Sequence, residues 1–294
     1  MAVLYFDVLK YIFSYADDVT KNKFILCSKE TLSFRFFFLY HDQINYYKIE
    51  HLKHRECFDQ FTNLIIYENP IKYPKNLNIL TVDSNQYPKD LVIPGGITHL
   101  TFGHGFNSHV KCLIPHGVTH LTFGKKYNHD IHGAIPPTVT HLDLGDHFNK
   151  NIKGLIPNSV THLTFGRWYT QSIKDAIPAN VTHLIIKTNQ YHLIRDFKGN
   201  IPNTVTHLTL QIEFQPGADI KGLIPEGVTH LKFGYYCAID LTNAIPVSVT
   251  HLTLRMPLSE NFYDMIPKTV TDLFLPSFTQ VNTSDIKAHV TYYD

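Results

Sequence analysis

The sequence lacks several features that would indicate particular functions. It carries 26 basic and 25 acidic residues, so it has none of the one-sided charge that is typical of nucleic-acid-binding or membrane-surface proteins. No apolar run is long enough to span a bilayer. The first residues include no basic stretch, and Asp7 interrupts their apolar run, so no signal peptide is predicted. We therefore expect neither a nucleic-acid nor a membrane partner.

Cysteine is scarce and scattered. Cys27, Cys57, Cys112 and Cys237 are far apart and show no paired spacing. This pattern favours reduced thiols in a cytosolic or nuclear protein over a disulfide framework or a zinc site.

Catalytic motifs are also missing. The chain contains neither His-Glu-x-x-His nor Gly-x-Ser-x-Gly, the signatures of zinc proteases and of serine hydrolases. Residues 117–126 begin with a glycine and end with two lysines, as a P-loop does, but the glycine spacing is wrong. The carboxylates are scattered. We predict a protein that is not an enzyme and uses no cofactor and no metal.

What the chain has in abundance is repetition. A Thr-His-Leu triplet occurs eight times, and Thr271-Asp272-Leu273 is a ninth, altered copy. A proline stands four residues before each of these threonines, and successive prolines are 21, 21, 21, 21, 24, 23, 21 and 21 residues apart. A period in this range is typical of a solenoid, in which each repeat buries its apolar side chains against its neighbours.

One repeat shows the pattern of a half-buried strand. Val118, Leu121 and Phe123 have the core spacing of a leucine-rich repeat, and His120 and Thr122 alternate with them on the other face. Gly124 ends the strand, and the proline belongs outside the sheet because it donates no hydrogen bond. The predicted fold is a leucine-rich-repeat-like solenoid, a parallel β-sheet of about ten 21-residue repeats with turns and extended backbone on the return side.

The two ends of the chain differ from its middle. Residues 1–40 show apolar positions at helical spacing and predict a small all-α N-terminal module. Residues 41–60 are polar and aromatic and predict a bridging helical segment. The array spans 61–294, with degenerate repeats at both ends and with two short insertions expected in loops at 190–198 and 215–219.

The repeat resembles that of the FNIP repeat family. The resemblance rests on an aromatic-Asn pair before Ile-Pro (Phe106-Asn107, Tyr127-Asn128, Phe148-Asn149) and on Val-Thr-His-Leu-x-Phe-Gly after it. It implies a leucine-rich-repeat-like fold over about residues 61–294. The family is abundant in social amoebae and in giant viruses of amoebae, which implies the cytoplasm, or the host cytoplasm for a viral protein.

Many members of that family carry an N-terminal F-box, and residues 3–40 resemble one without its leading Leu-Pro. The resemblance implies binding to a Skp1-like adaptor and thereby to a cullin ubiquitin ligase, with an unknown protein target held by the repeats. The residues expected to contact Skp1 are Leu4, Phe6, Val8, Leu9, Ile12 and Phe13. The alternative is a free-standing binding or structural scaffold whose N-terminal helices only cap the solenoid. In either case we expect a monomer.

The histidines of the triplets are the most conspicuous candidate site. They should form a ladder on one sheet face, about 4.8 Å apart: His99, His120, His141, His162, His183, His207, His230 and His251. Histidine suits a metal site or a pH switch. The plainer interpretation is packing, with neutral imidazoles hydrogen-bonded along the column. We favour packing because no Cys, Asp or Glu recurs beside the histidines. The residues that share this face could read a ligand: Thr101, Thr122, Thr164, Thr209 and Thr253, with Asp143, Ile185 and Lys232.

Overall fold

We describe the protein from a computed structural model that covers residues 41–54, 56–84, 91–188, 194–212, 214, 217–235, 240–255, 265–277 and 288–293. The predicted all-α module at 1–40, with the residues expected to contact Skp1, lies outside these described residues. No helix among the described residues is long and apolar enough to cross a membrane.

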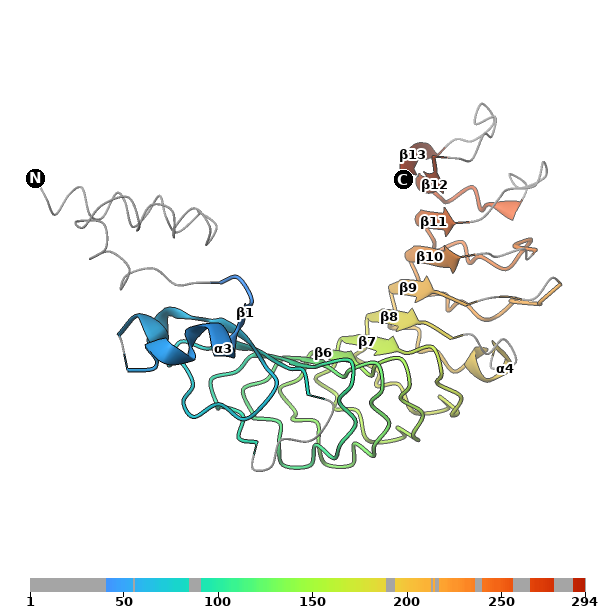
Figure 1. Cartoon of the computed structure of the whole chain (residues 1–294). Coiled ribbons are helices and arrows are strands. Elements are labelled where there is room, and N and C mark those ends of the chain that lie inside the picture. Colours follow the sequence, from blue (N-terminus) through green and yellow to red (C-terminus); the bar gives the residue numbers. More distant parts are fainter. Residues whose placement is uncertain are drawn as a thin grey trace, which may run out of the picture.

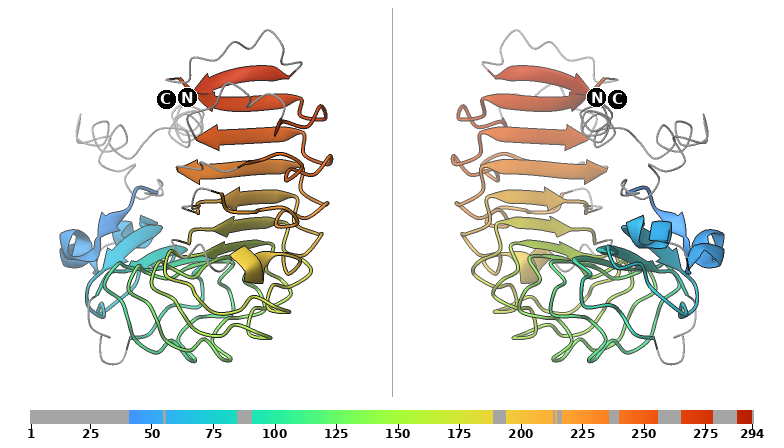
Figure 2. Two further views of the ribbon diagram at one scale, coloured as in Figure 1. Left: turned by 90° about the vertical axis from the view of Figure 1, so that its right-hand side faces the viewer. Right: turned by 90° about the vertical axis from the view of Figure 1, so that its left-hand side faces the viewer.

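The described chain forms one parallel sheet whose 13 strands follow one another in sequence order. The strands are β1 (Ile44–Asn45), β2 (Asn63–Ile66), β3 (Ile79–Val82), β4 (His99–Phe102), β5 (His120–Thr122), β6 (His141–Asp143), β7 (His162–Phe165), β8 (His183–Ile186), β9 (His207–Leu210), β10 (His230–Tyr235), β11 (His251–Arg255), β12 (Asp272–Pro276) and β13 (His289–Tyr293). The coils curve into an arc, with the strands on its concave side and the return loops on its convex side (Figures 1 and 2). The predicted leucine-rich-repeat-like solenoid of about ten turns is thus confirmed.

Equivalent residues of successive repeats are direct neighbours across the sheet. His99 pairs with His120, which pairs with His141, and the leucines and threonines follow the same register. Leu121 and Phe123 point into the core and are almost fully buried, whereas His120 and Thr122 are half-buried on the concave face. The alternation read from the sequence is therefore the actual division between core and surface.

The threonine before each histidine joins one coil to the next. The carbonyl of Thr98 accepts the backbone N–H groups of both Thr119 (2.9 Å) and His120 (3.0 Å). The same pattern recurs from Thr119 through Thr250. This satisfies the backbone at the beginning of each strand, where a buried unpaired group would cost about 1–3 kcal/mol.

The Ile-Pro pair lies in a turn outside the sheet, as predicted. The carbonyl of Pro115 accepts the N–H of Val118 at 3.1 Å, which closes a β-turn that leads into β5. Ile114 is buried before it.

The aromatic-Asn pair forms two columns on the return side. Phe106, Tyr127, Phe148 and Tyr169 are fully buried and lie 6.2–6.4 Å apart between ring centroids. Beside them, the side-chain oxygen of each asparagine accepts the backbone N–H of the equivalent residue one coil later: Asn107 from Asn128, Asn128 from Asn149, and Asn149 from Thr170, each at 2.9 Å. Thr170 lacks the amide, which explains why the asparagine column ends there.

Short helices occur in two places. Residues 41–60 contain α3 (Tyr46–Ile49), η2 (Glu50–Leu52) and η3 (Glu56–Gln60), but they also contain β1, which pairs with β2 and extends the sheet. The first insertion holds α4 (Ile194–Phe197), a single helical turn, where we had expected a loop. The three extra residues of that repeat give its return segment enough length to form a turn of helix. Residues 217–219, which are the described part of the second insertion, contain no strand or helix.

Candidate binding site on the concave face

The eight histidines form one continuous stack, hereafter the histidine column. Neighbouring ring centroids lie 3.9–4.1 Å apart with interplanar angles of 12–16°. This spacing is closer than the strand spacing of about 4.8 Å that we had expected for the side chains. The difference follows from curvature, because side chains on the concave face converge relative to their backbones.

The imidazoles are not hydrogen-bonded to one another, so that part of the packing interpretation is wrong. Nδ1 of each histidine instead lies 2.9–3.0 Å from Oγ1 of the threonine immediately before it, as in Thr161 and His162. Parallel stacked rings direct their nitrogens the same way, so no nitrogen of one ring can point at the next. The column is held by stacking along its length and by one threonine beside each ring.

Burial and crowding keep the inner rings of the column uncharged. Desolvation, followed by repulsion from other histidines of the column, lowers the pKa of six members: His120, His141, His162, His183, His207 and His230. The pKa of His162, in the middle of the stack, falls to about 4. These rings are therefore neutral at physiological pH.

The geometry does not favour a metal ion in the column. A tetrahedral or octahedral ion needs ligands that converge on one point, whereas stacked rings present parallel lone pairs. Among the described residues, no group of three or more His, Cys, Asp or Glu side chains is placed to hold a metal ion. The column ends at Asp272, whose Oδ2 lies 3.4 Å from Nε2 of His251.

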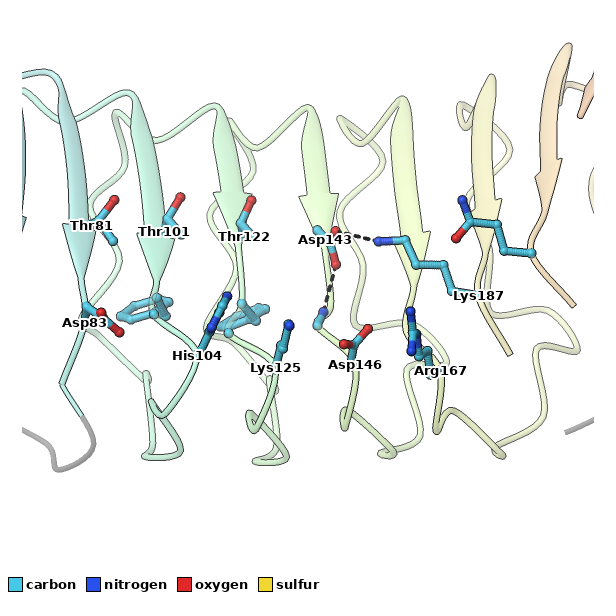
Figure 3. A pocket seen from close by; sticks show the side chains of 16 residues that line it. Thr81, Asp83, Thr101, His104, Thr122, Lys125, Asp143, Asp146, Arg167 and Lys187 are labelled. Carbon is cyan, nitrogen blue, oxygen red and sulfur yellow. Dashed lines mark hydrogen bonds and ion pairs between the residues drawn. The ribbon is translucent and has the colours of Figure 1, made fainter. Parts of the chain in front are cut away.

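Beside the column, the concave face is hollowed by a trough of about 620 Å³ that crosses the sheet from β3 to the end of β9 (Figure 3). One wall is a row of strand side chains: Thr81, Thr101, Thr122 and Asp143. The opposite wall consists of residues that follow the strands: His104, Lys125, Asp146 and Arg167. The trough thus presents hydroxyl groups on one side and charges of both signs on the other.

Glycines between the two walls let successive coils approach each other closely. A Cβ atom on Gly124 would overlap the carbonyl oxygen of Gly103, and one on Gly145 would overlap that of Gly124. Gly145 also has a φ of 77°, which disfavours any side chain. The strand-ending glycines form a row with one position per coil. Asp83 takes this position in the coil before Gly103, and Lys187 and Gln211 take it in the coils at the other end of the row. Side chains therefore bound the trough at both ends.

The charges in the trough are only partly paired. Lys187 lies 3.5 Å from Asp143, and Asp143 also accepts the N–H of Gly145 at 2.9 Å. Lys125 and Arg167 make no side-chain hydrogen bond or ion pair with any other described residue. Within the described part of the chain, these two cations on one wall are thus unpaired.

The sequence analysis identified one wall of this trough and missed the other. Of the residues expected on the ligand-reading face, Thr101, Thr122 and Asp143 line the trough. Thr164, Ile185, Thr209, Lys232 and Thr253 do not. The missed wall carried a detectable signal, since the residue after the strand-ending glycine is charged or imidazole-bearing in four successive repeats.

Comparisons with known proteins agree with this architecture. The model of the FNIP Repeat family matches residues 85–126, 106–147, 127–168, 148–189 and 220–255, which supports the resemblance to that repeat family. No curated protein is significantly similar to the chain.

The chain also matches two solved structures. CroV588, described as a novel circular LRR protein, is 27% identical with a TM-score of 0.59, over 80% of this chain and 40% of CroV588. This chain therefore spans well under half of that protein. The leucine-rich repeat-containing protein LegL7 from Legionella pneumophila is 18% identical with a TM-score of 0.41, over 63% of this chain and 76% of LegL7. The similarity to CroV588 supports a leucine-rich-repeat-like scaffold, a fold suited to binding proteins.

Proposed function

We propose that this chain, whose array matches the FNIP repeat model, is a non-enzymatic binding protein that holds a protein target on its concave face. The observation that carries the proposal is the trough, because Lys125 and Arg167 stand there without a partner among the described residues, beside a row of threonine hydroxyls. Broad sheet faces of solenoids are suited to this use, since many repeats contribute one side chain each.

We further propose that the N-terminal residues 1–40 bind a Skp1-like adaptor, so that the protein is the substrate receptor of a cullin ubiquitin ligase in the cytoplasm and works as a monomer. The support is the resemblance of those residues to an F-box. It gains weight from residues 46–60, where Tyr46, Ile49 and Phe58 are buried at the β2 end of the array. This segment already covers part of the first coil, so capping that coil does not require residues 1–40.

The second candidate is a free-standing scaffold whose N-terminal helices serve only as a cap. The two candidates are separated by co-expression with Skp1 and size-exclusion chromatography. We compare the full chain, the full chain with Leu9→Glu and Ile12→Glu, and a chain that begins at residue 42. The receptor requires co-elution of the unaltered full chain alone. If the folded full chain elutes without Skp1, the cap is the correct interpretation.

Target binding is tested separately. Proteins captured by the full chain are compared with those captured by Lys125→Glu/Arg167→Glu, with Lys150→Glu as the matched control because Lys150 is an exposed return-loop residue. A target that uses the trough is lost in the double variant and kept in the control. Equal capture by all three proteins would argue against the trough.

A further inference from the structure

The threonine beside each ring determines which nitrogen of the imidazole carries the proton. The hydroxyl of Thr161 lies 2.9 Å from Nδ1 of His162 and 3.3 Å from the carbonyl oxygen of Thr140, and its single hydrogen can serve only one of the two. That carbonyl already accepts two backbone N–H groups, from Thr161 and His162. We assign the hydroxyl hydrogen to the shorter contact, Nδ1, because the carbonyl is already satisfied. The proton of the neutral ring is then on Nε2.

The altered repeat supports the same assignment independently. Asp272 takes the histidine's place in the column, and the hydroxyl of Thr271 donates to its Oδ2 at 2.7 Å. A carboxylate can only accept, and the distance from the Thr271 hydroxyl to the preceding carbonyl, 3.2 Å, matches that in the other repeats. Thr271 thus donates to the side chain of the next residue, which can only accept. The threonines that precede histidines have the same distance to the preceding carbonyl, so we assign the same donation to Nδ1.

From this arrangement we propose that the histidine column, from His99 to His230, is a row of Nε2–H donors that binds the carboxylates of an acidic protein segment. In the half-buried rings from His120 to His230, Nε2 has no hydrogen-bond partner among the described residues and is accessible to solvent. The proposal rests on the proposed function, since it names the kind of target that the concave face would hold.

The end of the column already brings a carboxylate beside a ring, since Oδ2 of Asp272 lies 3.4 Å from Nε2 of His251. A partner carboxylate would instead approach the outer edge of an earlier ring, where Nε2 is accessible to solvent. Because the six rings from His120 to His230 are neutral and half-buried, they can be desolvated at less cost than ammonium or guanidinium groups. Each carboxylate can accept from two neighbouring rings 4.1 Å apart.

The charges around the column also suit an acidic segment. The charged groups on the same face are Asp143 on β6, Lys187 after β8, Lys232 on β10, Arg255 on β11 and Asp272 on β12. The guanidinium of Arg255 lies 5.6 Å from the ring centroid of Tyr293. Asp143 is paired with Lys187, and Asp272 with His251. Lys232 has no partner among the described residues, and neither has Lys125 or Arg167 in the adjacent trough. The unpaired charges among these residues are thus three cations, Lys125, Arg167 and Lys232. The trough also contains two carboxylates, Asp83 and Asp146.

The affinity for an acidic segment should increase as the pH falls. A bound carboxylate stabilises the protonated imidazole, so it raises the pKa of the histidines that it contacts. By linkage, the affinity then increases from pH 7.5 to about pH 5. Below about pH 4 the carboxylates of the partner become protonated, and binding is lost. A basic partner would show the opposite trend.

The proton assignment is tested without any partner. Full-length protein labelled with 15N in its histidines is studied by NMR, which distinguishes the protonated from the unprotonated ring nitrogen. We expect protonated Nε2 and unprotonated Nδ1 in the column. Protonated Nδ1 would overturn the proposal and leave the proposed target binding untouched.

The ligand class is tested with a peptide of repeated Glu-Gly units against one of repeated Lys-Gly units. We expect the acidic peptide to shift the column resonances and to bind more tightly at pH 5.5 than at pH 7.5. His141→Asn/His162→Asn/His183→Asn keeps an acceptor for each threonine but removes the outer N–H, and should weaken binding by about tenfold or more. The corresponding glutamine variant restores an outer N–H and should recover part of the loss. Preference for the basic peptide, or unchanged affinity in the asparagine variant, would overturn the acidic-partner assignment.

Discussion

Lys187 pairs with Asp143 across an intervening coil. The Lys187 Nζ atom, which follows β8, lies 3.5 Å from Oδ2 of Asp143 on β6, so the lysine side chain extends over the end of β7 (Figure 3). Lys187 stands where four preceding repeats have glycine, and both members of the pair line the trough.

The pair itself should contribute little to stability. Both side chains are about 30% exposed, at 29% and 31%, and such ion pairs are worth about 0–1 kcal/mol. In a double-mutant cycle of Lys187→Met and Asp143→Asn, we expect a coupling energy below about 1 kcal/mol that declines in high salt. Urea unfolding measures it. A coupling of several kcal/mol would mean that the pair is a structural clamp.

The glycines of the trough should be far less replaceable than the glycines of the turns. Gly124→Ala forces a Cβ into the carbonyl of Gly103 and should cost about 1–3 kcal/mol or more. Gly95→Ala is the control, because a Cβ there meets nothing within 4 Å, and should change stability by less than about 0.5 kcal/mol. Thermal unfolding of both variants checks the difference. Equal destabilisation would show that the coils are not as close as described.

The buried aromatic column allows a reciprocal test. Burial raises the pKa of Tyr127 above its ordinary range, and the described residues offer its hydroxyl no hydrogen-bond partner. Tyr127→Phe should therefore leave the protein equally or more stable, by up to about 1 kcal/mol. Phe148→Tyr adds a second such hydroxyl at a fully buried position and should destabilise by about 1–3 kcal/mol. Urea midpoints that moved the other way would indicate a partner for the Tyr127 hydroxyl.

Acid should destabilise the solenoid through the histidine column. The folded pKa of His162 is about 4, below its ordinary value of 6.5, so the unfolded chain binds more protons in this window. Burial of the neutral His162 ring therefore contributes stability that is complete above pH 6.5 and is lost as the pH falls from 6.5 through about 4.

The measurement is the urea midpoint between pH 7.5 and pH 4 for the unaltered chain and for His141→Gln/His162→Gln/His183→Gln. Carboxylates titrate in both proteins, so their common contribution cancels in the difference. We expect the unaltered chain to lose more stability than the variant. Parallel pH curves would contradict a role for the column.

Much of this protein was determined by local sequence. The 21-residue period, the alternation of Leu121 and Phe123 with His120 and Thr122, and the proline turns all predicted elements that the structure contains, because each follows from a repeated pattern that every neighbour shares. In-register stacking then made equivalent residues neighbours, so the histidine column could be expected as well.

Only the tertiary structure decided how these columns are used. Curvature brought the rings to 4.1 Å, and the neighbouring Thr-His contact, rather than contact between rings, satisfied Nδ1. The trough arises where Gly103, Gly124 and Gly145 stack and where Lys187 reaches back to Asp143. These features depend on distances between coils and on side-chain directions, which a repeat pattern does not contain.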